Sequence, residues 1–218
     1  LWIAKFPSAS DMLDVGGWEK VANELGLMAG LNMAEGKAQK FNNKHHTFLT
    51  RRFDRINSGG RYHFGSAMTL LGKTDGDGAA GASYIDIRDF IVQFGSQPNE
   101  DLEELWKRIV FNIAIKNTDD HLRNHGFILT PAGWKLSPAY DVNPIYHGTG
   151  LTLNITETDN RLDLSLALSV APLFRINNGK AEKIFKQVEK AISSWQKVAS
   201  KYKIPRNEQD IMSHAFQS

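Results

Sequence analysis

A short polar segment, Asn117-Thr-Asp-Asp-His-Leu-Arg-Asn124, lies between two stretches that are predicted to be buried. Before it, apolar residues recur at helical spacing after Pro98, which predicts a buried helix face with Asn99 as its cap. They are Leu102, Leu105, Trp106, Ile109, Val110 and Ile113. After it, residues 127–130 and 134–136 flank Pro131-Ala-Gly133, which indicates a hairpin. Functional sites tend to form in polar loops that rigid elements hold in this way.

The predicted hairpin leads to Ser137-Pro-Ala-Tyr-Asp141. Because a hairpin returns its ends to one neighbourhood, we expect Asp141 to come close to Asn124, beside a third polar group on Asp119. Magnesium prefers oxygen ligands and needs only one or two carboxylates besides substrate phosphates. Protein kinases use a catalytic-loop Asp, an Asn five positions later and a metal-binding Asp after a hairpin. The order and spacing here predict a metal–ATP site for phosphoryl transfer to a hydroxyl. The alternative is that Asp119 and Asp120 are caps and Asn124 a turn residue.

Two further charged residues fit the same chemistry. Lys5 lies among apolar residues on a strand predicted over residues 1–6, and Glu19 lies on a helix predicted over residues 18–28. A strand lysine paired with a helix glutamate positions phosphates in kinases. The alternatives are an edge-strand lysine that discourages strand pairing, and a solvated helix carboxylate.

The segment Arg51-Arg-Phe-Asp-Arg55 is dense in charge around one aromatic ring. We expect this segment to form a solvated face, an anion-binding patch, or a hinge whose backbone contacts an adenine. His121 would be a general base, a metal ligand or a structural histidine. The structural or phosphate-contacting role is favoured, because no second histidine stands beside it at a ligand spacing. For His125, a position facing the solvent is expected as readily as a role in the site. The His45-His46 pair is expected to lie on the surface of a loop.

The length and composition are those of one compact domain or two small lobes. The chain has 218 residues, 41% of them apolar, a formal charge of +2 and no cysteine, so disulfides and thiolate metal sites are excluded. No apolar run approaches the roughly 18 residues of a membrane span, so a cytoplasmic location is the default. The chain opens within a predicted strand, and we expect it to be a fragment of a longer protein.

The chain is expected to divide near residues 54–60. Residues 1–55 would form a small, strand-containing part and residues 56–218 a larger, mostly helical part. Further expectations are a strand over 47–53, a turn at Gly59-Gly60 with a returning strand over 61–64, a mobile loop over 72–81 and one helix over 180–202.

Five ordered motifs together resemble the HipA-like serine/threonine kinases, the toxins of bacterial toxin–antitoxin modules. The motifs are Trp2-Ile-Ala-Lys-Phe-Pro7, Trp18-Glu19 leading to Ala29-Gly30-Leu31, Arg52-Phe-Asp-Arg55, the segment 117–124 and Ser137-Pro-Ala-Tyr-Asp141. The resemblance implies an α+β, divergent protein-kinase-like fold, with a partial small N-lobe through a hinge (residues 1–55) and a helical C-lobe (residues 56–218).

The resemblance also implies roles for residues, all in an ATP- and Mg²⁺-dependent reaction. Asp119 would be the catalytic base, and Asn124 and Asp141 would hold magnesium. Lys5 would contact the ATP phosphates and pair with Glu19. Arg51, Arg52 and Phe53 would form the hinge beside adenine, and His121, Arg123, Asn124 and Tyr140 would complete the nucleotide site.

The partners that the resemblance implies are two proteins. One is a target protein that carries the phosphorylated serine or threonine, an aminoacyl-tRNA synthetase in known cases; family members often phosphorylate themselves as well. The other is a HipB-like, helix-turn-helix antitoxin whose complex with the toxin binds operator DNA. DNA contact is therefore expected only through the antitoxin, and no membrane partner is expected.

Two departures from the family pattern leave alternatives open. The loop that covers the ATP phosphates and normally carries the autophosphorylated serine should lie upstream of Trp2. Asp120 stands where the best-known member has a glycine, and its carboxylate would raise the pKa of the base or add a metal contact. One alternative function is a nucleotide-binding pseudokinase that acts through an antitoxin-like partner. Another is a metal-dependent phosphohydrolase built on Asp119, Asp120 and His121, which the missing second cluster of His and Asp residues disfavours.

Overall fold

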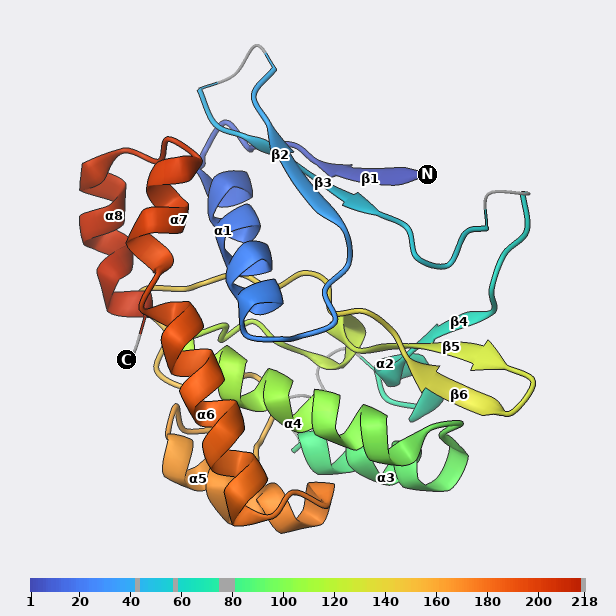
Figure 1. Ribbon diagram of the computed structural model, residues 1–218. Helices are drawn as coiled ribbons and strands as arrows, with labels where there is room; N and C mark the ends of the chain where they lie inside the picture. The colour runs from blue at the N-terminus through green and yellow to red at the C-terminus, as the bar shows by residue number, and fades with distance from the viewer. Residues whose placement is uncertain (42–43, 57–58, 75–80, 217–218) are drawn as a thin grey trace.

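The computed structural model describes residues 1–218 except 42–43, 57–58, 75–80 and 217–218. It contains two separate three-stranded sheets and a set of helices that surround the longest one, α4 (Figure 1). The predicted α+β class is confirmed. Part of the segment expected to be a mobile loop, residues 75–80, lies outside the described residues.

The first sheet is antiparallel, with strand order β1-β3-β2. It contains β1 (Trp2–Lys5), β2 (Gly36–Gln39) and β3 (Thr47–Arg51), and Lys5 lies opposite Phe48. Helix α1 (Val15–Met28) packs beneath β2 and β3 (Figure 1). It begins three residues before the predicted start because the Asp14 carboxylate caps it, accepting a hydrogen bond from the Gly17 amide at 3.1 Å.

The second sheet has the order β4-β5-β6, with β4 (Phe64–Ser66), β5 (Gly126–Thr130) and β6 (Gly133–Leu136). The predicted hairpin of β5 and β6 is confirmed, in antiparallel register. The predicted returning strand over 61–64 is confirmed only in part: Arg61 pairs back with Arg55 in an isolated antiparallel bridge, whereas the regular strand begins at Phe64 and pairs with β5. Arg52 and Arg55 both pair with Asp54, which folds this segment into a turn and ends the first sheet at Arg51.

The larger part is built around α4 (Pro98–Ala114), whose apolar face is buried as predicted. Asn99 is not its cap. Pro98 occupies the first helical position, where its missing N–H costs nothing, and Asn99 accepts a hydrogen bond from Arg175 Nη1 at 2.6 Å. Helix α2 (Ala67–Leu70) follows β4, and α3 (Tyr84–Phe94), which packs against α4, starts with a capping box of Ser83 and Asp86.

The predicted helix over 180–202 is two helices, α6 (Asn178–Ile192) and α7 (Trp195–Lys201). The break falls at Ser193 and Ser194, whose hydroxyls both donate to the Lys190 carbonyl and so compete with the helical hydrogen bonds. The remaining C-terminal elements are α5 (Leu164–Val170), the 3₁₀ turn η3 (Ala171–Phe174), α8 (Arg206–Met212) and η4 (Ser213–Ala215).

Helix α1 also packs against α6 and α7, so it belongs to both parts of the molecule (Figure 1). The Trp18 ring lies 6.2 Å from that of Trp195 and 6.1 Å from that of Phe216. The buried Glu208 carboxylate accepts a hydrogen bond from the Asp14 amide at 2.8 Å. These contacts fix the first sheet on the helical part, while the boundary at residue 55 stays a prediction. Among the described residues, no helix is both long and apolar enough to cross a membrane.

Candidate active site

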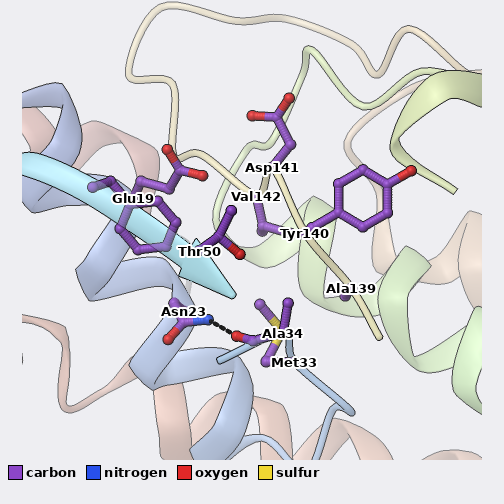
Figure 2. Close-up of a pocket in the computed structure, with 10 residues that line it drawn as sticks. Glu19, Asn23, Met33, Ala34, Thr50, Ala139, Tyr140, Asp141 and Val142 are labelled. Carbon is purple, nitrogen blue, oxygen red and sulfur yellow. Dashed lines mark hydrogen bonds between the residues drawn. The ribbon is translucent and has the colours of Figure 1, made fainter. Parts of the chain in front are cut away.

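Lys5, Glu19 and Asp141 come together from three elements. Lys5 ends β1, and its ammonium nitrogen lies 2.6 Å from Glu19 Oε1 on α1 and 2.5 Å from Asp141 Oδ1 after β6. The predicted pairing of Lys5 with Glu19 is therefore present, and it extends to Asp141. Figure 2 shows the Glu19 and Asp141 carboxylates at one end of a small cavity of about 10 Å³ that Tyr140 and Thr50 also line.

Burial and charge act in opposite directions on this trio. Burial raises the pKa of Glu19 to about 7, although the Lys5 ammonium opposes the rise. Burial by itself would lower the pKa of Lys5, but Glu19 and Asp141 together raise it above its usual value. Lys5 therefore stays positively charged beside two carboxyl groups. In this position its ammonium could release a carboxylate and bind a phosphate oxygen instead.

Asp141 has a left-handed backbone, with a φ of 56°. A residue other than glycine rarely adopts this conformation without support from its surroundings. Asn143 supplies part of that support: its side-chain amide donates to Asp141 Oδ1 at 3.1 Å, and its backbone amide donates to Asn117 Oδ1 at 3.2 Å. The segment after the hairpin thus lies against the polar loop, while the expected approach of Asp141 to Asn124 stays a prediction.

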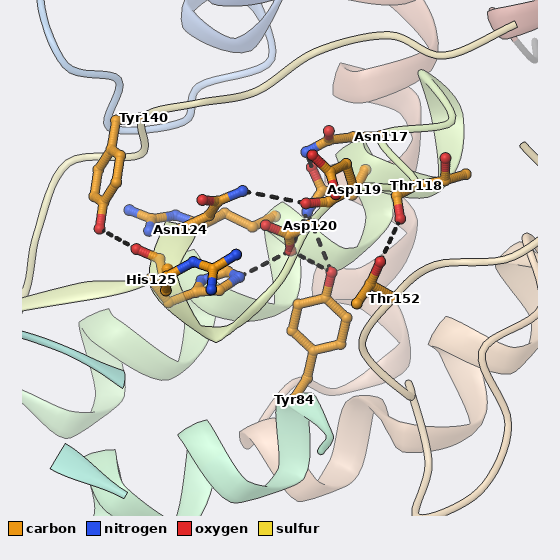
Figure 3. A network of polar contacts seen from close by, with 12 residues as sticks. Tyr84, Asn117, Thr118, Asp119, Asp120, Asn124, His125, Tyr140 and Thr152 are labelled. Carbon is orange, nitrogen blue, oxygen red and sulfur yellow. Dashed lines mark hydrogen bonds and ion pairs between the residues drawn. The ribbon is translucent and has the colours of Figure 1, made fainter. Parts of the chain in front are cut away.

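The polar loop presents Asp119 to the solvent and buries Asn124. Residues Leu122–Asn124 form the 3₁₀ turn η2, which brings the Asn124 amide nitrogen within 3.3 Å of the Asp119 carbonyl (Figure 3). Because this hydrogen bond uses the nitrogen, the amide oxygen is the group that Asn124 can offer to a cation.

Asp120 does not lie beside Asp119 as a second surface acid. It is buried, and its Oδ2 accepts hydrogen bonds from Tyr84 at 2.5 Å, Asn112 at 2.9 Å and His125 at 2.8 Å (Figure 3). Burial alone would raise the pKa of Asp120, but the His125 imidazole and the hydrogen bonds hold it below its usual value. These hydrogen bonds show that Asp120 anchors the loop from below, and the two roles considered for it, a metal contact and repulsion of the base, stay predictions.

Three histidine expectations are corrected by the same reasoning. His125 is buried against Asp120, not at the solvent. His45 and His46 are also buried, and His46 Nδ1 lies 2.5 Å from the Asp14 carboxylate that caps α1. A buried imidazole needs a polar partner, which Asp120 supplies to His125 and Asp14 to His46.

The structure argues against the metal ligands that the phosphohydrolase alternative requires. It required Asp120 and His121 to act with Asp119, yet Asp120 is committed to the buried network. Within the part of the chain that the structure describes, no group of three or more His, Asp and Glu residues could hold a metal. A single carboxylate with an amide oxygen suits magnesium, which takes its other ligands from water and phosphates.

His121 and Arg123 belong to the polar loop, and Tyr140 contacts it. Arg123 Nη2 lies 3.2 Å from His121 Nε2, while the buried Nδ1 of His121 has no hydrogen-bond partner among the described residues. The Tyr140 hydroxyl donates to the Arg123 carbonyl at 2.6 Å. Burial raises the pKa of Tyr140 well above its usual value, so the phenol remains a donor. This hydrogen bond ties Tyr140 to the loop.

The predicted hinge forms one wall of a cavity of about 230 Å³. Its lining includes Arg51, Arg52 and Phe53 together with Phe64 and Tyr140. The Phe53 ring lies 5.6 Å from that of Tyr140 and 5.8 Å from that of Phe64, so the cavity has the aromatic walls that a planar base would pack against. The backbone amides of Arg51 and Arg52 donate to Glu35 and Leu1, so both already have partners within the first sheet.

Sequence reasoning missed Asn143, Tyr84 and Asn112. Asn143 stands two residues after Asp141, and that spacing was the only available signal. Tyr84 lies far from the loop in the sequence, whereas Asn112 lies on α4 only eight residues before Asp120. Nothing in the local pattern of either residue shows that it meets Asp120.

Comparison with known proteins places this geometry in a family. A model described as the HipA-like C-terminal domain matches residues 1–195. A Haemophilus influenzae protein named "Putative kinase" is 31% identical over 147 residues, which make up 62% of this chain and 43% of that protein. The chain thus spans less than half of the length of this relative.

Two solved structures share the fold. HipA of Shewanella oneidensis MR-1, solved with HipB and operator DNA, matches 98% of this chain and 55% of its own, with a TM-score of 0.77 and 17% identity. The Helicobacter pylori proinflammatory kinase CtkA matches 92% of this chain and 90% of its own, with a TM-score of 0.57 and 14% identity. The predicted kinase-like fold is confirmed, and the match over residues 1–195 shows that the chain belongs to the HipA-like C-terminal domain family.

Proposed function

We propose that this domain is the catalytic core of an ATP-dependent serine/threonine protein kinase that acts as the toxin of a HipA-type toxin–antitoxin pair. The observation that carries the proposal is the bridge that Lys5 makes to Glu19 and Asp141. It joins the strand, the helix and the post-hairpin segment that a kinase uses to hold ATP phosphates and metal.

The residues divide the reaction among them. The aromatic cavity beside Phe53 and Tyr140 receives the adenine, and Lys5 binds phosphate oxygens while Glu19 positions it. Asn124 and Asp141 would hold magnesium, which would neutralise the phosphate oxygens. Asp119, exposed in the polar loop, accepts the proton of the attacking serine or threonine hydroxyl.

The toxin context rests on the family and on the structural match. The Shewanella HipA was solved with HipB and operator DNA. We infer that this chain, within its whole protein, pairs with a HipB-like helix-turn-helix antitoxin and reaches DNA only through it. Its target is a protein serine or threonine, for which an aminoacyl-tRNA synthetase is the first candidate to assay, and autophosphorylation is a second readout.

Transfer of radiolabelled phosphate from ATP, with Mg²⁺, tests the proposal. Asp119→Asn keeps the size of the side chain but removes the base, so transfer should fall by about 10²-fold or more while nucleotide affinity is retained. Asp89→Asn changes an exposed aspartate on α3 and serves as the matched control. Unchanged transfer in Asp119→Asn would refute the catalytic assignment. ATP binding without transfer by the wild-type protein would instead favour a pseudokinase that acts through an antitoxin-like partner.

A further inference from the structure

A second cavity, of about 300 Å³, opens beside Asp119. Its polar lining includes Asp119, Asn143 and His147, and its apolar lining includes Leu13, Val15, Trp18, Ile145 and Met212. It shares no lining residue with the aromatic cavity at Phe53. The proposed reaction gives the aromatic cavity a ligand, but it leaves this second cavity without one.

The chain itself links the two cavities. Tyr140 lines the aromatic cavity, Asp141 contacts Lys5, and residues 143–147 line the second cavity. Asp141 therefore separates the two along the sequence. In-line phosphoryl transfer requires the acceptor hydroxyl to approach from the side away from the departing ADP. Asp119, the proposed base, lies in the wall of the second cavity and does not line the aromatic cavity, so the second cavity is the one suited to the acceptor.

We propose that this cavity binds a large apolar side chain adjacent to the phosphorylated serine or threonine of the protein substrate. The inference rests on the proposed kinase function and deepens it by naming a substrate class. Because Asp119 belongs to the wall, a residue seated in the cavity holds its neighbour's hydroxyl within reach of the base.

The chemistry of the wall selects an apolar occupant. Trp18 and Met212 are almost fully buried, so they form a fixed apolar floor. An acidic side chain would be repelled by Asp119. A basic one would pair with the Asp119 carboxylate and compete with the hydroxyl for it. A leucine, methionine or phenylalanine avoids both penalties and gains from leaving water.

Val15 is the residue that tests the cavity with least damage to the fold. It is 47% exposed and is the first residue of α1, where an aspartate is compatible with the helix dipole. Val15→Asp places a charge in the apolar wall. Val92→Asp makes the same change at a 41% exposed position on α3 that does not line the cavity. Thermal unfolding of both variants checks that they fold.

The assay measures transfer from radiolabelled magnesium–ATP to synthetic peptides with one serine, in which each flanking position is varied among Ala, Leu, Phe, Lys and Glu. We expect Leu or Phe to be preferred at one flanking position. Val15→Asp should raise the KM of that peptide about tenfold, the range for one lost apolar contact in a pocket, and Val92→Asp should not.

Three outcomes are distinguishable. A preference lost only in Val15→Asp supports the cavity as the substrate pocket. Efficient transfer without a flanking preference, or with one that Val15→Asp retains, overturns the inference and leaves the kinase function standing. No transfer by the wild-type protein, to any peptide or to itself, overturns the proposed function and this inference with it.

Discussion

Glu19 is the residue whose ionisation controls the Lys5 cluster. It is 3% exposed, and burial raises the pKa of its carboxyl to about 7 against an ordinary value of 4.5. The folded protein thus holds a proton that the unfolded chain has released between these two values. The free energy of unfolding must therefore fall as the pH rises through that window.

This pH dependence can be measured by urea unfolding of the wild type and of Glu19→Gln at about pH 5 and pH 8. At about 1.4 kcal/mol for each pH unit of the window, the wild type should lose on the order of 3 kcal/mol that Glu19→Gln does not lose. Equal pH dependence in the two proteins would show that Glu19 ionises normally in the fold.

The Asp120 network supports the catalytic loop from the core. Tyr84→Phe removes one of the three donors to Asp120 Oδ2 and leaves the ring in place. The free energy of unfolding should drop by about 1–3 kcal/mol, because the buried carboxylate loses a hydrogen bond that no water replaces. Tyr62→Phe, at a 45% exposed ring, should leave it nearly unchanged. A loss as small as that of the control would mean that Asn112 and His125 alone satisfy Asp120.

The residues that could be predicted from the sequence were those within one local pattern. Asp119 and Asn124 share a loop, and a hairpin connects that loop to the segment of Asp141, so chain geometry alone predicts that this segment lies against the loop. Asp120 could not be assigned in the same way. Its partner Tyr84 comes from α3, and only the packing of α3 on α4 places that hydroxyl under the loop.

At the scale of elements, α1 links the cap at Asp14 to the position of Glu19. The Asp14 carboxylate accepts hydrogen bonds from the Gly17 amide and from the His46 amide at 2.7 Å, so it fixes the helix start against the strand that follows His46. Five residues later the same helix presents Glu19 to Lys5. Loss of the cap should therefore disturb the nucleotide site as well as the fold.

Asp14→Ala is expected to cost about 1–2 kcal/mol of unfolding free energy and to weaken binding of a magnesium–ATP analogue, measured by titration calorimetry. Asp163→Ala removes the cap of α5, whose carboxylate accepts from the Ser165 amide far from the site. It should lower stability without changing nucleotide affinity. If both variants bind equally well, α1 does not depend on its cap to position Glu19.

Element boundaries were harder to predict than element types. The period of apolar residues identified α1, α4 and the hairpin. It could not show that Ser193 and Ser194 interrupt the last long helix, because apolar residues continue at helical spacing on both sides of the break. It also could not show that β4 joins β5, since strand partners depend on tertiary packing.

At the scale of the whole molecule, the two parts are expected to unfold together. Trp18 of α1 packs against Trp195 and Phe216, and the Trp195 and Phe216 rings stack at 4.7 Å. Because α1 also supports the first sheet, the sheet cannot melt without exposing this aromatic cluster. Thermal unfolding followed by tryptophan fluorescence and by far-ultraviolet circular dichroism should give one coincident transition.

Phe216→Ala should lower the midpoint of that single transition without splitting it. Two separate transitions in the wild type would mean that residues 1–55 form an independently stable unit, and the aromatic cluster would then not couple the parts.

A crystal structure with Mg²⁺ and a non-hydrolysable ATP analogue tests the central claim most directly. We predict adenine against Phe53 and Tyr140, phosphates at Lys5, and a magnesium ion held by Asn124 and Asp141 with Asp119 facing the terminal phosphate. A nucleotide bound elsewhere, or a metal ion away from both Asn124 and Asp141, would contradict it.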